Sequence, residues 1–235
     1  MHKSMTIRLI TFDLDDTLWD VRPALEAAEG AQWSYLNARY PSLSLAATPA
    51  AQISELRRAL LKEKPELMHH ISLFRQSFIE RLLQYHGIAD DEAASAASEA
   101  FAAFLSRRHD VLLYADTQSV LTTLGREFTL GALTNGNADV RKTPIGPCFD
   151  YAWRAEEFGV SKPDPALFHK AFEQAGVSAD QVIHIGDCHE NDVSGAVAAG
   201  AKAIWFSPEG SASEIASGVV QQLSDLPGAI KRLTG

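Results

Sequence analysis

Apolar residues between about residue 20 and residue 110 recur at the spacing of one face of an α-helix. Pro41 ends the first of these apolar stripes and His86-Gly87 closes the third, as proline and glycine commonly do at helix ends. No convincing strand lies among them, so this part of the chain is predicted to be all-helical. The stripes are Trp33, Leu36 and Tyr40; Ile53, Leu56 and Leu60; Ile71, Phe74, Phe78 and Leu82; and Ala97, Phe101 and Phe104.

The rest of the chain alternates short apolar runs with helical segments. The helices are clearest at Pro165–Ala175 and Asp192–Ala199, which Gly176 and Gly200 end. Strands that alternate with helices of this length are typical of right-handed crossovers and of a parallel sheet covered on both faces. The runs predicted as strands are residues 7–12, Phe128–Thr134, Tyr151–Ala155, Gln181–Gly186 and Lys202–Phe206.

Together these patterns predict an α/β fold, a Rossmann-like doubly wound parallel sheet interrupted by an inserted all-helical domain. We expect residues 1–18 and 112–235 to form the sheet domain and residues 19–111 the inserted one. The tail after Ser207 is rich in Gly and Ser, and a short helix is expected from Pro227. Ligands of such sheets bind beyond the carboxyl ends of the strands, which is where the polar residues Asp13, Thr134 and Asp187 occur.

The overall charge argues against two classes of binding partner. The 235 residues carry a formal net charge of -9, which argues against binding to nucleic acid or to an anionic membrane. Cys148 and Cys188 lie far apart without metal-ligand spacing, so we expect reduced thiols. The first apolar run is interrupted by Arg8 and stopped by Asp13, unlike a signal peptide. We therefore expect a cytoplasmic protein.

Three carboxylates follow the first apolar run within four positions. Asp13 and Asp15 are two residues apart, so on an extended backbone their side chains leave the same face, repel each other and favour a bound divalent cation. Asp13 could then attack as a nucleophile while Asp15 transfers a proton. A solvated acidic turn and a calcium loop are the alternatives. A loop of the EF-hand type, however, needs glycine where Leu18 stands.

Two further loops carry groups that can hold phosphate oxygens. Thr134, Asn135 and exposed backbone N–H groups follow the second predicted strand, although Asn-Gly is also a hairpin sequence. The polar stretch after it has no alternating apolar pattern to pair back, which disfavours the hairpin. Lys162 precedes Pro163 on a stiff connector, where its ammonium could neutralise a phosphoryl oxygen. Taken alone, such a lysine is commonly a solvated charge.

Another acidic cluster follows the strand predicted at Gln181–Gly186. Asp187 at the strand end and Asp192 at the next helix start would complete an oxygen site suited to Mg²⁺. For Asp192, a simple helix N-cap is an equally good interpretation. Cys188 and His189 raise the alternative of zinc, but adjacent residues do not easily reach one metal and no second pair of ligands exists in the sequence.

The motifs DLDDTL, TNG, SKPDP and GDCHEND, in this order, resemble those of the haloacid dehalogenase superfamily of phosphotransferases. The helical insertion resembles that superfamily's first type of cap. The resemblance implies that Asp13 is the nucleophile and a Mg²⁺ ligand, and that Asp15 is the general acid and base and lends its backbone carbonyl to the metal. It implies that Thr134 and Lys162 bind the phosphoryl group with the help of Asn135. The same resemblance implies that Asp187 ligates the metal and that Asp192 supports the site.

Several activities occur in this superfamily. Halide leaves without a proton, so Asp15 favours phosphoryl transfer over a 2-haloacid dehalogenase. A phosphomutase or a phosphatase of nucleotides or sugars would keep Asp15 and stays open. A transporting ATPase would need membrane helices, and a non-catalytic relative would have lost a motif residue. We expect a Mg²⁺-dependent phosphatase that forms an aspartyl-phosphate, acts on a phosphorylated small molecule, and is a monomer or a weak homodimer.

The helical part gives a finer resemblance. The segments TLWDVRPAL, LRRALLKEKPEL and FRQSFIERLL are similar to bacterial phosphatases that act on flavin mononucleotide and on the phosphorylated ribityl-pyrimidine of riboflavin synthesis. Trp19, His69, Phe74 and Arg75 could stack on a flat ring or meet a polar substituent. Alternatively, Phe74 belongs to the core of the helical domain and His69 is solvated.

Overall fold

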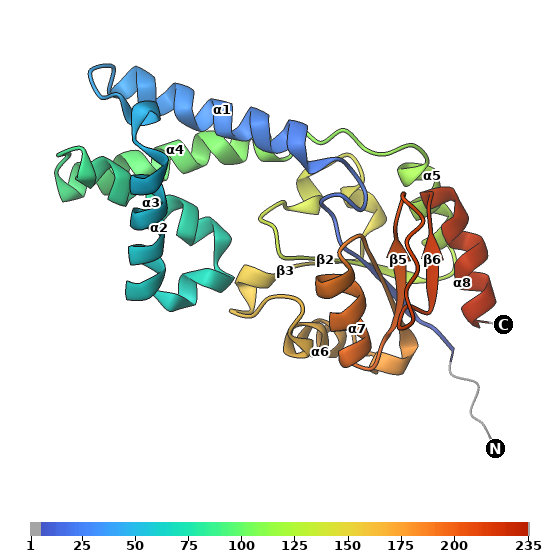
Figure 1. Ribbon diagram of the computed structural model, residues 1–235. Coiled ribbons are helices and arrows are strands. Elements are labelled where there is room, and N and C mark those ends of the chain that lie inside the picture. The colour runs from blue at the N-terminus through green and yellow to red at the C-terminus, as the bar shows by residue number, and fades with distance from the viewer. Residues whose placement is uncertain (1–5, 235) are drawn as a thin grey trace. The chain divides into compact units, whose positions relative to one another are not determined.

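The computed structural model describes residues 6–234 (Figure 1). These residues divide into two compact units. One unit comprises the chain up to Val21 and resumes at Val111, and the other runs from Arg22 to Asp110. The domain boundaries expected from the sequence, after residue 18 and before residue 112, fall within three residues of this division. Of the helices in the described part of the chain, none combines the length and the apolar composition that a membrane crossing requires.

The first unit is built on a six-stranded sheet in the order β3-β2-β1-β4-β5-β6, and every neighbouring pair of strands is parallel. The predicted doubly wound parallel sheet is therefore confirmed. β6 was not predicted because it is only three residues long and lies in the polar tail. The strands are β1 Leu9–Phe12, β2 Thr129–Thr134, β3 Tyr151–Arg154, β4 Val182–Gly186, β5 Lys202–Phe206 and β6 Gly218–Val220.

Strand β1 is fully buried in the middle of the sheet because all four of its side chains are enclosed. Phe12 lies opposite Ala132 of β2 and Ile185 of β4. The carboxyl ends of β1, β2 and β4 consequently meet at one edge of the sheet. The residues that follow these strands are brought within reach of one another, although they are far apart in the sequence.

Helices cover both faces of the sheet (Figure 1). α5 (Thr117–Leu124) and α8 (Leu226–Thr234) contribute to the apolar cluster that contains Ile10 and Phe12 of β1. α6 (Pro165–Gln174) and α7 (Gly195–Ala198) contribute to the cluster that contains Leu9. Because side chains of a strand alternate between its two faces, Ile10 and Phe12 point to one helical layer and Leu9 to the other.

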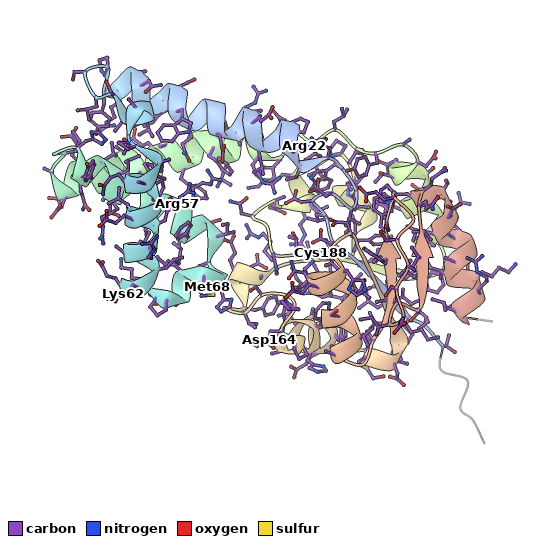
Figure 2. All side chains as sticks on the ribbon, in the orientation of Figure 1. Arg22, Arg57, Lys62, Met68, Asp164 and Cys188 are labelled. Carbon is purple, nitrogen blue, oxygen red and sulfur yellow. The ribbon has the colours of Figure 1, made fainter. Side chains whose placement is uncertain are left out.

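The turn before α7 differs from its prediction. The helix was expected to begin at Asp192, but a π-helical turn already starts at His189 and runs to Ser194 before α7 continues it. Cys188, labelled in Figure 2, is the residue that caps this turn. Asp192 lies inside the turn and its Oδ2 accepts the N–H of Cys188 at 3.0 Å. The N-cap interpretation of Asp192 is therefore wrong, since the carboxylate folds back from within the turn.

The second unit contains four α-helices in its described residues and has an apolar core of its own. Leu36, Phe78, Leu82 and Ala97, which belong to the predicted stripes, lie in this core. The all-helical prediction agrees with this arrangement. The stripe expected to form one helix from Pro65 is divided, because a 3₁₀ turn, Pro65–His69, precedes the third helix. The helices are α1 Val21–Arg39, α2 Ala50–Glu63, α3 Ile71–Tyr85 and α4 Asp90–Arg108.

Candidate active site

A cavity of about 240 Å³ opens at the edge of the sheet where β1, β2 and β4 end. Polar residues from four separate loops line it. All seven site residues predicted for the sheet domain contribute, so the structure brings them together. The lining residues are Asp13, Asp15, Thr134, Asn135, Gly136, Lys162, Asp187, Cys188, Asn191 and Asp192.

Lys162 is the central cation of this cavity, and its side chain is only 2% exposed. Its Nζ donates to Asp13 Oδ1 and to Asp192 Oδ1, both at 2.6 Å, and to the backbone oxygen of Leu133 at 2.9 Å. All three protons of the ammonium are thereby directed to oxygen atoms. The lysine lies beside the predicted nucleophile and is held there by a second carboxylate.

Asn135 positions Lys162 from the other side. Its Nδ2 donates to the backbone oxygen of Lys162, and its Oδ1 accepts the backbone N–H of Lys162, each at 2.9 Å. Both ends of the carboxamide are thus engaged by the lysine's own backbone. Thr134 is buried at the end of β2 and its Oγ1 accepts the N–H of Gly136 at 3.0 Å. Because both neighbours of β2 are parallel strands, the hairpin alternative for Asn135-Gly136 is wrong.

Asp192 acts as a support inside the cluster. Its Oδ1 accepts from Lys162 and lies 3.1 Å from His184 Nε2, while its Oδ2 accepts from Cys188. Gly186 makes this approach possible, because a Cβ at this position would overlap the carboxylate of Asp192. The carboxylate therefore meets protein donors with both oxygens, which agrees with the supporting role that the family resemblance implied.

His184 was not among the predicted site residues. It is fully buried in β4, its Nδ1 lies 2.8 Å from Thr11 Oγ1, and its ring meets the edge of Phe168. Its Nε2 lies 3.1 Å from Asp192 Oδ1, so His184 joins the hydrogen-bond network of Asp13, Lys162 and Asp192. The sequence does carry a signal for it, because His184 is the single polar residue in an otherwise apolar strand.

Thr17 is a second residue that the sequence analysis missed. It is fully buried, donates to Asp187 Oδ1 at 2.9 Å and accepts the N–H of Asp187 at 3.1 Å. Trp205 adds a bond from Nε1 to the backbone oxygen of Asp187 at 2.7 Å. These bonds fix both the backbone and the carboxylate of Asp187. A hydroxyl residue two positions after Asp15 was the available signal.

Trp19 requires a correction. Its ring is 0% exposed in the core of the sheet unit, and its Nε1 donates to Asp15 Oδ1 at 2.8 Å. The expectation that Trp19 contacts a substrate ring is therefore wrong, and the indole instead orients the second carboxylate. Asp16 has a φ of 60°, and its Oδ1 accepts the N–H of Val21 at 3.0 Å, where α1 begins. This third carboxylate thus shapes the loop, as aspartate can in the left-handed region.

Burial and the neighbouring charges together set the pKa values of the cluster. It raises the pKa of Asp13 well above its ordinary value, although the Lys162 ammonium opposes this shift. Burial also disfavours the charged form of Lys162, but Asp13 and Asp192 outweigh it, so the pKa of Lys162 lies above its ordinary value. For Asp192, Lys162 and His184 overcome the effect of burial and hold the pKa well below the usual range. Burial raises the pKa of Asp187 to about 6.

The donor set fits a divalent cation. Oxygen atoms of Asp13, Asp187 and Asp192 lie within 4.8 Å of one another. Four carboxylates and one ammonium line the cavity, so negative charge is in excess among its described residues. A cation would favour the ionised forms of Asp13 and Asp187, whose pKa values burial raises. Since Asp192 is engaged by protein donors, Asp13 and Asp187 are the residues that would hold the ion.

The zinc alternative has no support in the geometry. Cys188 Sγ lies 3.5 Å from the backbone nitrogen of Asn191, whereas His189 Nε2 lies 2.8 Å from Ser213 Oγ. The His189 ring also meets the edge of Trp205. The thiol and the imidazole therefore face different partners.

The remaining predicted residues belong to the helical unit. Phe74 and Arg75 are half-buried and line a cavity of about 290 Å³ within that unit. The guanidinium of Arg75 lies 4.0 Å from the centre of the Phe104 ring and donates to Glu29 at 3.2 Å. His69 is half-buried and is not among the residues that line this cavity. Whether these side chains meet a substrate stays a prediction.

A buried lysine thus faces an aspartate at the carboxyl edge of the parallel sheet, where the ligands of such sheets bind. The family model of the haloacid dehalogenase-like hydrolases matches residues 7–200. The chain belongs to this family, and the predicted membership is confirmed.

Three proteins illustrate how similar this chain is to known members of the family in sequence and in structure. The 5-amino-6-(5-phospho-D-ribitylamino)uracil phosphatase YigB of Escherichia coli is 32% identical over 203 residues, 86% of this chain and 84% of that protein. A 2-haloacid dehalogenase from Pseudomonas syringae pv. Tomato is 40% identical with a TM-score of 0.91, over 97% of this chain and 100% of that one. The magnesium-bound HAD-hydrolase YfnB from Bacillus subtilis, at 22% identity, shares the fold with a TM-score of 0.67, over 96% and 99% of the two chains.

These relatives refine the class. The similarity to a ribityl-pyrimidine phosphatase, expected from the helical segments, is confirmed. The family match and the phosphatase relatives support a phosphoric monoester hydrolase. Phosphatases of this family generally use a metal ion, and the acidic cluster of Asp13, Asp187 and Asp192 is suited to one.

Proposed function

We propose that the chain is a Mg²⁺-dependent phosphatase that hydrolyses phosphomonoesters of small organic molecules through an aspartyl-phosphate. The observation that carries the proposal is the contact of 2.6 Å between Lys162 Nζ and Asp13 Oδ1, in one cavity with Asp15 and Thr134. A nucleophile, a proton carrier, a hydroxyl and a cation are the groups that phosphoryl transfer to a carboxylate needs.

The reaction has two steps. An oxygen of Asp13 forms a bond to phosphorus while the ester P–O bond breaks, and the leaving alkoxide takes a proton from Asp15. A water molecule then attacks the same phosphorus, gives its proton to Asp15 and displaces the Asp13 carboxylate, releasing phosphate. Thr134 and Lys162 bind the phosphoryl oxygens, and Asn135 keeps Lys162 in place. When bound by Asp13 and Asp187, Mg²⁺ supplies positive charge for the phosphoryl group.

The relatives support a substrate class. The name of the Escherichia coli relative specifies a phosphorylated ribitylamino-uracil, so we propose this compound or flavin mononucleotide as the substrate. A nucleotide or sugar phosphate, or a phosphomutase reaction, would use the same groups. In this proposal the partner is a small phosphorylated molecule in the cytoplasm, and the protein works as a monomer or a weak homodimer.

Replacing the nucleophile tests the proposal. Asp13→Asn should lower Mg²⁺-dependent hydrolysis of an aryl phosphate by at least about 1,000-fold, because the amide cannot form the intermediate. Hydrolysis is measured by phosphate release, and folding by circular dichroism. Asp164→Asn is the matched control, since Asp164 caps α6 and asparagine caps a helix equally well. Retained activity in Asp13→Asn would refute the assignment.

A 2-haloacid dehalogenase is the second candidate, because a structure that is 40% identical carries that description. Halide needs no proton on leaving, whereas an alkoxide does. Asp15→Asn should therefore slow the hydrolysis of alkyl phosphates by about 100-fold or more and that of an activated aryl phosphate much less. Chloride release from 2-chloropropionate, unaffected by Asp15→Asn, would establish the dehalogenase instead.

A further inference from the structure

The helical unit contains a cavity of about 290 Å³ among α1, α2 and α3 that the proposed chemistry does not use. Its walls combine aromatic rings with polar groups. Trp33, Phe74 and Phe78 supply the rings, and Gln32 and Arg57 are among the polar residues. Small-molecule sites commonly have this composition, mostly apolar with a few polar groups that fix orientation. The volume is at the lower end for such sites, so it suits a ligand of one or two rings.

Most polar groups of this cavity already have partners. Arg75 is paired with Glu29 and lies over Phe104. The guanidinium of Arg57, which is labelled in Figure 2, lies 4.8 Å from the centre of the Phe78 ring. Two guanidinium groups and one carboxylate leave the lining with a positive balance. The walls therefore favour an electron-rich planar group, such as a ring that carries carbonyl oxygens.

Gln32 is the exception. The residue is 2% exposed, and its Oε1 has no hydrogen-bond partner within the described part of the chain. A buried carbonyl oxygen without a hydrogen-bond partner is costly, and a retained one indicates a role. The carboxamide has an acceptor end and a donor end, which match an N–H and a C=O placed side by side on a ring.

We propose that this cavity binds a planar heterocycle with adjacent N–H and C=O groups, as in a pyrimidinedione, and that Gln32 recognises that edge. The aromatic walls hold the faces of the ring, and the guanidinium of Arg57 lies near its carbonyl oxygens. The site recognises a ring and not a phosphoryl group. Its test therefore does not require that the chain be a phosphatase, and either proposal can fail alone.

Lumazine, a fluorescent bicyclic pyrimidinedione, is the probe, and its dimethyl derivative, in which both ring N–H groups are methylated, is the matched ligand. The full-length chain should bind lumazine about tenfold more tightly than the derivative, the effect expected of one or two neutral hydrogen bonds. Gln32→Met, which keeps the shape of the side chain, should remove this preference. Gln52→Met, at a half-buried glutamine of α2 outside the lining, should retain it.

Comparing two ligands in each variant separates recognition from folding, because a structural defect would weaken both ligands alike. Equal binding of the two ligands by the unaltered chain, no binding at millimolar lumazine, or a preference that survives Gln32→Met would each overturn the proposal. Inhibition kinetics then show whether the bound ring belongs to the substrate or to a separate ligand. Lumazine that raises the KM for flavin mononucleotide without changing kcat places the ring in the substrate, whereas unchanged kinetics place it in a separate ligand.

Discussion

The two units differ in how deeply their paired charges are buried. In the sheet unit, Thr11, His184, Asp192, Lys162 and Asp13 form one continuous network in which each polar group meets another. In the helical unit the ion pairs Arg39–Glu99, Arg75–Glu29 and Arg81–Glu63 keep their side chains partly exposed, and the buried carboxamide of Gln32 has an oxygen without a partner in the described chain. Buried charges that hold one another fix a geometry for chemistry, whereas a buried group left without a partner is suited to bind another molecule.

Replacing Lys162, the central cation of the sheet unit, should have the largest effect on stability and on hydrolysis. Lys162→Met leaves Asp13 and Asp192 buried without their countercharge, which should lower the free energy of unfolding by about 3–5 kcal/mol at neutral pH. Hydrolysis should fall by at least about 100-fold, because the proposed function assigns the ammonium to the phosphoryl oxygens. Urea unfolding and phosphate release measure the two effects.

The lysine variant has a matched control. Lys170→Met removes an exposed ammonium from α6 and should change neither quantity. The stability deficit of Lys162→Met should shrink in acid, where both carboxyl groups can take up protons. A deficit that is the same at pH 4 and pH 8 would mean that packing, and not charge, explains the loss.

A smaller effect is expected at Asp187. Its pKa in the folded chain, about 6, lies above the ordinary value of 3.8, so its contribution to stability is fully present below pH 3.8 and is lost as the pH rises through 6. Asp187→Asn stays neutral and should stabilise the metal-free protein by about 1 kcal/mol at pH 8, a figure reduced for the partial exposure of the carboxyl. At pH 3.5 the gain should vanish.

Thermal unfolding in the presence of a chelator gives this measurement. Asn retains the oxygen that accepts from Thr17, so the hydrogen bond of 2.9 Å is not the variable. An equal gain at both pH values would show that the ionisation of Asp187 does not limit stability.

The smallest effect is expected in the helical unit. Arg81 and Glu63 form an ion pair of 2.6 Å, as short as that of Lys162, but their side chains are 30% and 53% exposed. Water already solvates both charges, so Arg81→Met should leave the midpoint of urea unfolding unchanged. A loss comparable to that of Lys162→Met would remove the distinction between buried and exposed pairs.

The sequence was sufficient for the sheet and for the groups at its edge. Asp13, Thr134 and Asp187 each end or follow an apolar run, and parallel strands bring such ends to one rim. The alternation of strands and helices likewise predicted a doubly wound parallel sheet. β6 was missed because three residues in a Gly/Ser-rich tail carry no periodic signal.

The supporting contacts required the structure. His184 and Thr11 meet across 173 positions of sequence, and neither has a local pattern that names the other. Trp19 was expected to face a ligand, but aromatic residues next to a site are as readily buried as exposed, and its N–H found Asp15. Similarly, the helical stripes gave the faces of α1 and α3, yet the unpartnered oxygen of Gln32 is visible only when every neighbour is placed.

The central place of β1 has a consequence for the order in which the protein can be made. β1 is the first strand among the described residues, but its two neighbours begin at Thr129 and at Val182. During synthesis, both of its edges therefore stay unpaired until the helical unit has been made, and one of them until β4 leaves the ribosome. A nascent chain that ends before Val182 would present β1, the strand that leads to Asp13, with an open edge. Such chains should depend on chaperones, and Asp13 acquires its full surroundings only after β4 has been made.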